Sequence, residues 1–521
     1  MFIITSYPSI HFLLKLITTI LILLNPSPNN ATHNTKPTPN FQIQESTIKD
    51  IQKAFKQNTL TSLQLLHFYV KQINKLNPTL RAVIEINPDA SAQAKAADTR
   101  RAKGEARKSW VDGIPILIKD NIGTKDKMNT TAGSYALLGS IVGFDSGVVK
   151  RLRDNGAVIL GKASLSEWAN FRSNFAPSGW CARSGQGKNP YNLSATPCGS
   201  SSGSAIAAAA NMAAVTLGTE TDGSILCPSS ANSVVGIKPT LGLTSRGGVV
   251  PISPRQDTVG PICRTVTDAA YVLESIVGYD PYDSEATMKA TKYIPIGGYS
   301  QFLKLDGLKG KRLGILRKSF FDDVSPYLAT VYNQHFRTLR QRGAVILDNL
   351  EIPTYDAMSS SNYEEMLLET EFKLALNSYL KQLVKSPVRS LADVIEFNRK
   401  HAHKEMIKEY GQGIFYSAEA TKGIKSKEKK ALATLASWSR DGFEKVMNEK
   451  RLDAIIGPGY SSFTSVLAIG GYPGISVPAG YDEDGAPFGI MFGGLKGSEP
   501  QLIEIAYAFE QATLVRKPPA F

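Results

Sequence analysis

Cysteine is scarce in this sequence. The 521 residues include four cysteines, and no two of them have the CxxC spacing. This excludes a disulfide-rich scaffold and offers no pattern typical of a structural zinc site. We therefore expect neither a metal nor another cofactor. One or two disulfides and buried thiols both remain open for Cys181, Cys198, Cys227 and Cys263.

Beyond residue 24, the sequence contains no long run of apolar residues. The run at 16–24 has the length of the apolar region of a signal peptide and is too short to cross a bilayer. We interpret residues 1–31 as a signal peptide or leader and 32–44 as a flexible entry segment. This predicts a secreted, extracellular protein without a membrane span in its mature chain; an uncleaved leader anchored in an endomembrane is the alternative. Glycosylation sequons, which make a glycoprotein the matching expectation, begin at Asn30, Asn129 and Asn192.

Basic residues outnumber acidic ones, 59 to 46, which gives a net charge of +13. Such a balance can favour a nucleic-acid partner. The basic residues are scattered, however, and the densest cluster, at 422–430, is interrupted by Glu428. Mixed charge of this kind is typical of a solvated helix face. We expect no nucleic-acid partner.

Short apolar segments alternate with helical patterns along the chain, and 42% hydrophobic residues suffice for a large core. This alternation predicts an α/β fold with a large mixed, mostly parallel central sheet covered by helices on both faces. We expect one domain over 45–521, with a helical, charged, strand-poor insertion around 355–450. Strands are predicted at 113–118, 157–160, 214–217, 312–316, 344–347, 452–456, 474–477 and 488–492. Helices are predicted at 325–341, 362–384, 391–410, 427–449 and 499–512.

Three segments carry candidate chemistry. Lys119 follows the apolar strand at 113–118, at the strand end where α/β sheets place ligand sites. The sequence CGSSSGSA at 198–205 precedes an alanine-rich helix, and GTETDGS at 218–224 follows the strand at 214–217. Glycines around a serine after a strand can form a nest of backbone N–H groups. Taken alone, each segment is more typical of an ordinary feature: a surface lysine, a Gly/Ser turn that caps a helix, and a loop, respectively.

Two familiar motifs nearly match. The segment 156–163 approaches a phosphate-binding Walker A loop, but Ala163 lacks the hydroxyl that would bind magnesium. The segment 199–203 matches the G-x-S-x-G nucleophile elbow, although the residues before it are polar and contain prolines rather than forming a buried strand. An α/β-hydrolase-type esterase that uses Ser201 with His401 or His403 therefore remains an alternative.

Taken together and in order, the three segments resemble the amidase signature family. The resemblance continues through 235–240, 256–261, 475–481 and 506–512, and covers roughly residues 45–515. Within the family the sequence is most similar to the peptide-amidase-like branch and related eukaryotic amidases. The resemblance implies the amidase signature fold and hydrolysis of a carboxamide C–N bond in a small-molecule or peptide amide.

The resemblance also implies roles for single residues. Ser224 corresponds to the nucleophile, Ser200 to a bridging serine that follows a cis peptide bond, and Lys119 to the base. The family's oxyanion hole corresponds to the backbone N–H groups of Thr221, Asp222, Gly223 and Ser224. One departure is Cys198, which stands where the family has its first signature glycine.

The chemistry of a serine and a lysine is consistent with those roles. A serine hydroxyl is a weak nucleophile until a base takes its proton. Lysine can be that base near neutral pH only if its pKa falls by roughly three units, which burial beside Ile116, Leu117 and Ile118 favours. An acyltransferase would use the same acyl-enzyme with another acceptor, and a non-catalytic binding protein on the same scaffold is a further alternative.

The residues that select the substrate are less clearly marked. Candidates for the walls of the cleft, chosen by their position near the motifs, are 130–135, 167–170 and the 355–450 insertion. Trp168 and Tyr135 in these segments are equally typical of core aromatics. The oligomeric state is undecided, with a homodimer among the options.

Overall fold

The computed structural model describes residues 41–321 and 324–521. From Gln42 to Phe521 they belong to one compact unit. The predicted leader at 1–31, the sequon at Asn30 and most of the entry segment at 32–44 lie outside the described residues. None of the described helices is long and apolar enough to span a bilayer.

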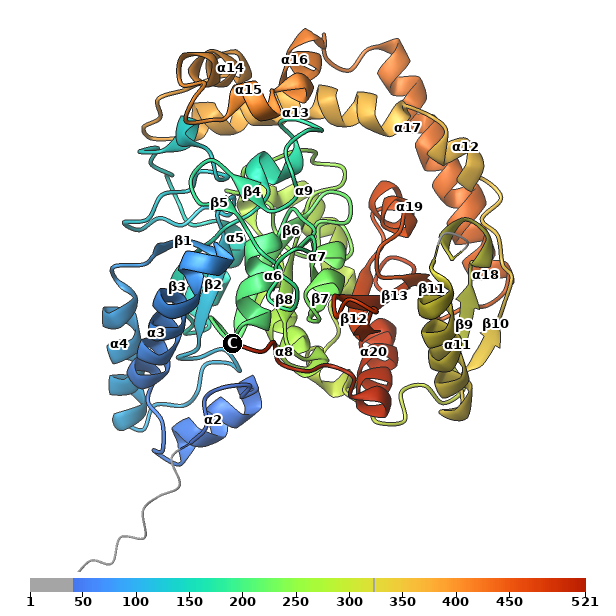
Figure 1. The fold of residues 1–521 in the computed structure, drawn as a ribbon, viewed down its shortest axis with the longest axis horizontal. Coiled ribbons are helices and arrows are strands. Elements are labelled where there is room, and N and C mark those ends of the chain that lie inside the picture. Colours follow the sequence, from blue (N-terminus) through green and yellow to red (C-terminus); the bar gives the residue numbers. More distant parts are fainter. Residues whose placement is uncertain (1–40, 322–323) are drawn as a thin grey trace, which may run out of the picture. The chain divides into compact units, whose positions relative to one another are not determined.

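An eleven-stranded sheet runs through the centre of this unit (Figure 1). In spatial order its strands are β1 (Val83–Ile86), β3 (Val158–Ala163), β2 (Pro115–Lys119), β6 (Val215–Glu220), β8 (Thr258–Cys263), β7 (Val235–Lys238), β12 (Gly474–Tyr481), β13 (Pro487–Gly493), β11 (Ala454–Pro458), β9 (Arg312–Ile315) and β10 (Val345–Leu347). A separate small sheet pairs β4 (Trp180–Cys181) with β5 (Gly185–Gln186).

The predicted mixed sheet is confirmed, but parallel pairing is less extensive than expected. Among the described strands, parallel neighbours occur in two groups, β3–β2–β6 and β11–β9–β10. In both groups helices connect the strands, as parallel neighbours require. The other neighbours in the main sheet are antiparallel. The antiparallel strand β13 is buried along its whole length, so its apolar sequence looks like that of a parallel strand.

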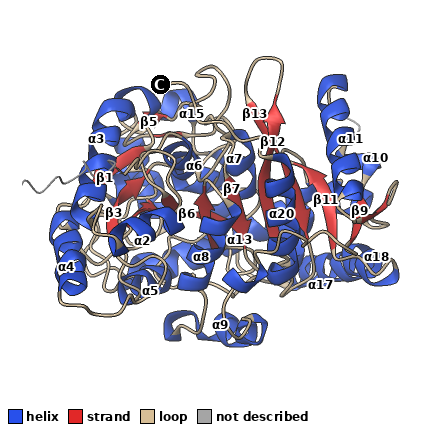
Figure 2. Ribbon diagram, turned by 90° about the horizontal axis from the view of Figure 1, so that it is seen from below, coloured by secondary structure: helices blue, strands red, loops and turns tan. Residues whose placement is uncertain are grey.

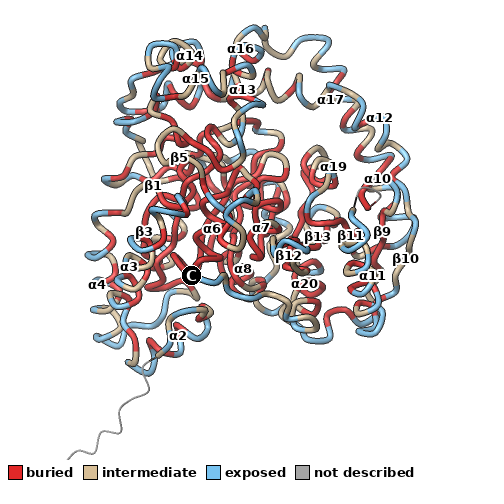
Figure 3. Tube along the Cα trace, in the orientation of Figure 1, coloured by how far each residue is buried: buried red, intermediate tan, exposed pale blue. Residues whose placement is uncertain are grey.

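Helices cover both faces of the sheet (Figure 2). On one face lie α6 (Ser202–Ala209) and α7 (Leu226–Ala231), and on the other lie α5 (Gly147–Asp154) and α8 (Val266–Ile276), with α20 (Glu499–Thr513) beside α8. The strands and the inner sides of these helices form the buried core (Figure 3). The remaining helices outside the insertion are α2 (Ile48–Lys56), α3 (Ser62–Leu80), α4 (Ala90–Ala102), α9 (Ser284–Ala290), α10 (Arg317–Phe320), α11 (Pro326–Gln341) and α19 (Phe463–Gly470).

A helical segment follows β10 and leads to β11 (Figure 1). Its α-helices are α12 (Tyr355–Ser359), α13 (Tyr363–Gln382), α14 (Leu391–Lys400), α15 (Ile407–Tyr410), α16 (Gly413–Ala420), α17 (Ser426–Ser439) and α18 (Lys445–Glu449). Phe372 and Leu376 of α13 and Phe415 of α16 pack in one cluster with Trp168. Trp168 is therefore a core aromatic, packed edge-on against the ring of Phe415 at 5.6 Å.

The predicted helix over 391–410 is interrupted between α14 and α15 by the turn that carries Glu405. This carboxylate is fully buried, and its Oε1 accepts hydrogen bonds from Ser134 Oγ (3.0 Å) and Tyr135 N (2.8 Å). The guanidinium of Arg172 lies between Glu405 and Glu167 and pairs with both. Burial, together with the nearby Glu405, raises the pKa of Glu167. These contacts attach the helical segment to the loops after β2 and β3.

Candidate active site

Lys119 is the last residue of β2, and its side chain is completely buried. Its ammonium nitrogen lies 2.8 Å from Ser200 Oγ, 2.8 Å from Thr219 Oγ1 and 3.2 Å from the Thr219 carbonyl oxygen. The strand holds the backbone of Lys119 between β3 and β6, so the side chain extends past the strand end to the segment before α6. The predicted contact between Lys119 and Ser200 is present.

Burial lowers the pKa of Lys119 to about 7, although the nearby Glu220 and Asp257 act in the opposite direction. Burial also lowers the pKa of Lys162 and Lys238 to about 8. Lys162 Nζ donates to the Ile122 carbonyl (2.6 Å) and to Thr130 Oγ1 (2.9 Å), and Lys238 Nζ donates to the Tyr472 carbonyl (2.6 Å). Lys119 differs from these two lysines because one of its partners is a serine hydroxyl.

Ser200 belongs to the short segment that enters α6. The Gly199–Ser200 peptide bond is cis, as the resemblance implies, and Cys198 has a positive φ of 51°. The Ser200 carbonyl accepts a hydrogen bond from Ser166 N at 3.0 Å. Ser200 is fully buried, so its hydroxyl is directed by protein contacts rather than by solvent.

The loop 221–224 follows β6, and neighbouring side chains hold it in place. Thr221 Oγ1 donates to Asp257 Oδ1 at 2.6 Å, and Ser465 Oγ donates to Asp222 Oδ2 at 2.6 Å. Gly223 has a φ of 75°, which glycine adopts without strain. Within the described part of the chain, the N–H groups of Asp222, Gly223 and Ser224 donate to no protein acceptor. These N–H groups are thus available to a ligand oxygen.

Glu220 makes this loop possible by capping the residues that follow it. One oxygen of its buried carboxylate accepts hydrogen bonds from Ile225 N (2.6 Å) and Leu226 N (2.9 Å). Glu220 therefore satisfies the N–H groups of Ile225, the N-cap of α7, and of Leu226, the first residue of that helix. Burial raises the pKa of Glu220.

Ser224 lies at the end of this loop and is 8% exposed. Its carbonyl accepts a hydrogen bond from Ser201 N at 3.1 Å, which joins the two serine-bearing segments. Among the described residues, no side-chain hydrogen bond links Ser200 to Ser224. The structure thus brings the three predicted residues into one region, and Ser200, the predicted bridging serine, is hydrogen-bonded to Lys119 but not to Ser224 among the described residues.

A cavity of about 680 Å³ opens beside these residues. On one side it is bordered by Asp222 and Gly223, and on another by Cys198 and Gly199. Asn170 also lines it, as expected for the 167–170 segment, whereas no residue of 130–135 or 355–450 does. Sequence reasoning did not identify the other lining residues, which are Ser178, Cys227, Phe320, Val324, Tyr460, Ser461, Ser462 and Thr464.

The geometry can be compared with known proteins. The Amidase family model matches residues 64–464, which is more than half of the chain. The chain belongs to the amidase signature family. It is 60% identical over 484 residues to an Arabidopsis thaliana protein named as a probable amidase, with 92% of each chain covered.

Solved structures agree with this assignment. The peptide amidase of Stenotrophomonas maltophilia is 42% identical, with a TM-score of 0.87, and the match covers 92% of this chain and 99% of that one. An amidase family protein from Bacillus anthracis is 36% identical, with a TM-score of 0.86, over 92% of this chain and 93% of that one. This amidase is accordingly a hydrolase that acts on amides.

The alternative that places the nucleophile at Ser201 finds no support in the structure. Ser201 is fully buried, and its hydroxyl donates to the Thr219 carbonyl at 3.0 Å and accepts from Thr219 N at 3.2 Å. His401 Nδ1 lies 2.9 Å from the Phe397 carbonyl oxygen, and no hydrogen bond joins Ser201 to a histidine in the described residues. Ser201 therefore positions Thr219, a partner of Lys119.

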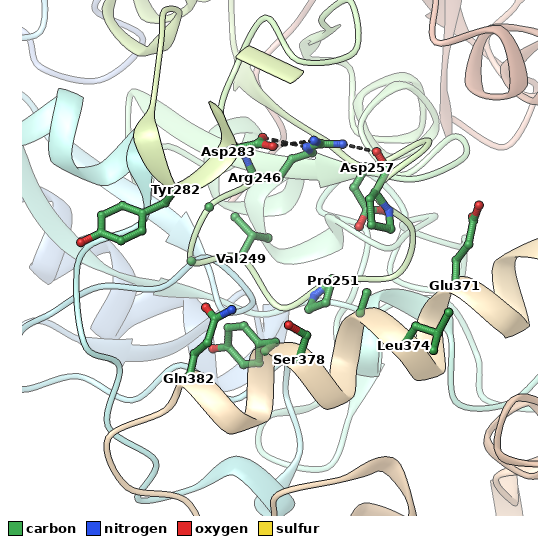
Figure 4. A pocket seen from close by; sticks show the side chains of 15 residues that line it. Arg246, Val249, Pro251, Asp257, Tyr282, Asp283, Glu371, Leu374, Ser378 and Gln382 are labelled. Atoms are coloured by element: carbon green, nitrogen blue, oxygen red, sulfur yellow. Dashed lines mark hydrogen bonds and ion pairs between the residues drawn. The ribbon is translucent and has the colours of Figure 1, made fainter. Parts of the chain in front are cut away.

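A second cavity, of about 440 Å³, lies between α13 and the loop 246–257 (Figure 4). Arg246 and Asp283 form an ion pair at its rim, at 2.6 Å, and Leu374 and Ser378 of α13 line its opposite wall. Lys119, Ser200 and Ser224 line neither cavity themselves, but Gly199 and Gly223, the residues just before the two serines, line the larger cavity and not this one. Asp257, which holds Thr221, also borders it, so this cavity lies behind the anchor of the 221–224 loop.

Replacement of Ser201 by alanine tests its structural role. The variant should lose about 1–3 kcal/mol of unfolding free energy, because the buried N–H of Thr219 loses its acceptor, while the Thr219 carbonyl keeps its contact with Lys119 Nζ. It should still hydrolyse an amide, at a reduced rate. Urea denaturation and an amide hydrolysis assay measure the two effects, with Ser200→Ala as the matched control that loses turnover. Loss of all turnover in Ser201→Ala, with activity retained in Ser224→Ala, would identify Ser201 as the nucleophile.

Proposed function

We propose that this amidase hydrolyses a carboxamide C–N bond through Ser224, Ser200 and Lys119, with an acyl-enzyme intermediate. The observation that carries the proposal is the 2.8 Å hydrogen bond between Lys119 Nζ and Ser200 Oγ in a fully buried environment. A buried amine with a pKa of about 7 is substantially neutral at physiological pH. Only the neutral amine has the lone pair that accepts a proton.

The proton moves in two steps. Ser224 Oγ attacks the amide carbon, and its proton passes to Ser200 Oγ while the Ser200 proton passes to Lys119 Nζ. The tetrahedral intermediate then collapses as the same groups return a proton to the leaving amine, which leaves an ester on Ser224. Water repeats the sequence on the ester and releases a carboxylic acid. The Ser200–Ser224 hydrogen bond forms when the substrate is bound, since catalytic hydrogen bonds are often long before the substrate arrives.

The negative charge of the intermediate needs donors that are already in place. The unpaired N–H groups of Asp222, Gly223 and Ser224 support this role, and the N–H of Thr221 starts the same loop. Donors fixed by the protein do not have to reorganise during the reaction, and each is worth about 3 kcal/mol of transition-state stabilisation. The anchors at Asp257 and Ser465 keep the loop in this arrangement.

The substrate we infer is a peptide-type or other small carboxamide. Support comes from the 42% identity to the peptide amidase of Stenotrophomonas maltophilia. The cavity of about 680 Å³ is large enough for an amide with one or two neighbouring groups. Phe320, Val324 and Tyr460 offer apolar contacts, while Asn170 and Ser461 offer polar ones.

Entry into the secretory pathway is also proposed. The disulfide between Cys198 and Cys227 supports it, because such bonds persist in oxidising compartments. The side chain of Asn129 is hydrogen-bonded to Glu85 and Gly139, which argues against a glycan there. Within the described residues we propose Asn192 as the acceptor, because its Nδ2 contact, with the Asp484 carbonyl at 3.3 Å, is exposed, whereas the contacts between Asn129 and Glu85 are partly buried.

Replacement of Ser224 by alanine should abolish amide turnover while the protein stays folded, because the hydroxyl is nearly buried and alanine fits its space. A fluorophosphonate probe should label the parent protein on Ser224 and should fail to label the variant. Circular dichroism serves as the folding control. Near-normal amide cleavage by Ser224→Ala would contradict the assignment.

The pH dependence of kcat/KM should report Lys119. Since the neutral amine is the active form, activity should rise with pH, be half-maximal near pH 7, and remain high on the alkaline side. Lys119→Ala should lose most of the activity, by about 10²- to 10⁴-fold, and its remaining activity should no longer show the rise around pH 7, which is the acidic limb of the pH profile. The matched control is Lys162→Gln, which alters another buried lysine and should keep the limb. A limb that disappears in Lys162→Gln but remains in Lys119→Ala would refute the role of Lys119.

A further inference from the structure

A disulfide joins the segment that carries Ser200 to the first turn of α7, the helix that directly follows the loop with Ser224. Cys198 lies two residues before Ser200, and Cys227 lies three residues after Ser224. The bonded cysteines are 29 residues apart in the sequence, and both border the cavity beside the serines. The other two cysteines, Cys181 and Cys263, are free thiols. The sequence alone left this distribution open.

Few other contacts connect these two segments directly. Ser201 N donates to the Ser224 carbonyl at 3.1 Å. Further along, Asn232 Nδ2 donates to the Pro197 carbonyl at 2.9 Å and to the Pro228 carbonyl at 2.8 Å. Along the chain, the disulfide lies between the Ser201–Ser224 hydrogen bond and the Asn232–Pro197 hydrogen bond. It is the covalent link among these three contacts.

The relative position of the two segments matters for the proposed chemistry. Both segments lie outside the strands and helices, and each is tied to the helix that follows it: Ala205 N donates to the Ser201 carbonyl (3.1 Å), and Cys227 N donates to the Gly223 carbonyl (2.8 Å). The Ser200 segment must keep its hydroxyl on Lys119, while the 221–224 loop must hold Ser224 and the N–H donors. A displacement of one segment by about 1 Å can lower a rate by about 10²-fold even when the fold is intact.

We propose that the Cys198–Cys227 disulfide positions the Ser200 segment against the 221–224 loop, so that the amidase is active in its oxidised form and loses turnover when this bond is reduced. The inference rests on the proposed function of Ser200 and Ser224. It assigns the two cysteines a positioning role, since their sulfur atoms take no part in bond making or breaking on the substrate.

Reduction of the Cys198–Cys227 bond by a small dithiol balances in electrons and protons. A small dithiol gives two electrons and two protons, the Cys198–Cys227 bond becomes two thiols, and the dithiol becomes a cyclic disulfide. The reductant can approach from the cavity, because both bonded cysteines border it and each is 8% exposed. Cys181 and Cys263 are completely buried, and burial raises the pKa of both thiols, which makes them unreactive.

The first experiment uses a Cys181→Ala/Cys263→Ala background, in which the disulfide is the one remaining target among the cysteines. The full chain is treated with dithiothreitol without denaturant, and alkylation followed by mass spectrometry counts the thiols released. We expect kcat to fall about tenfold or more as two thiols appear, with KM changed much less and circular dichroism unchanged. Reoxidation should restore kcat. Unchanged kcat in protein that has gained both thiols would overturn the proposal.

The second experiment removes the bond genetically in the Cys198→Gly/Cys227→Ala variant. Glycine adopts the φ of 51° at position 198 without strain, so the variant should fold. We expect the same loss of kcat, a slower reaction of Ser224 with fluorophosphonate, and no further response to dithiothreitol. A purely structural bond would instead lower the melting temperature and leave kcat and the labelling rate of the folded protein at parental values, which would refute the positioning role.

The two proposals fail in different ways. If Ser224→Ala keeps its turnover, the proposed function is wrong whatever the disulfide does. If Ser224→Ala is inactive but the reduced protein and the Cys198→Gly/Cys227→Ala variant keep parental kcat, the nucleophile stands and the positioning role is wrong.

Discussion

The hydrogen bond between Lys119 and Ser200, shielded from water, is the contact on which the rest of the site depends. It requires an amine at the end of a central strand, a serine hydroxyl delivered by a separate segment, and walls that exclude solvent. All three conditions are met, because β2 lies between β3 and β6 and the segment before α6 passes over its end. Burial here lowers the pKa of an amine that would be charged in water.

The surrounding structure holds the Ser200 segment and the 221–224 loop in place around that hydrogen bond. Glu220 satisfies the start of α7, Asp257 and Ser465 hold the 221–224 loop, and Ser201 connects it to the Ser200 segment. The ion pairs of Arg172 with Glu167 and Glu405 attach the helical segment between β10 and β11 to the loop after β3. Buried polar groups are costly unless they are paired, so these contacts fix one arrangement of the loops rather than several.

The sequence predicted the parts of the fold and site that depend on local patterns. The strand before Lys119, the helix after Ser200 and the loop after β6 follow from short-range signals, and their order identified the family. Strand direction and order depend on pairings between distant segments, which the sequence pattern does not predict. The strands β7 and β8 are not predicted either, and β8 contains Gly260 and Pro261, residues more typical of a turn than of a strand interior. Tyr460 and Thr464 reach the cavity from far along the chain, so no local signal marks them.

The most direct measurement is the titration of Lys119 itself. In Ser224→Ala protein with ¹³C-labelled lysine, the Cε resonance of Lys119, assigned by its absence in a Lys119 variant, can be followed against pH. We predict a midpoint near 7. A midpoint near 10.5, the ordinary value for lysine, would mean that the amine is charged at neutral pH and cannot accept the serine proton.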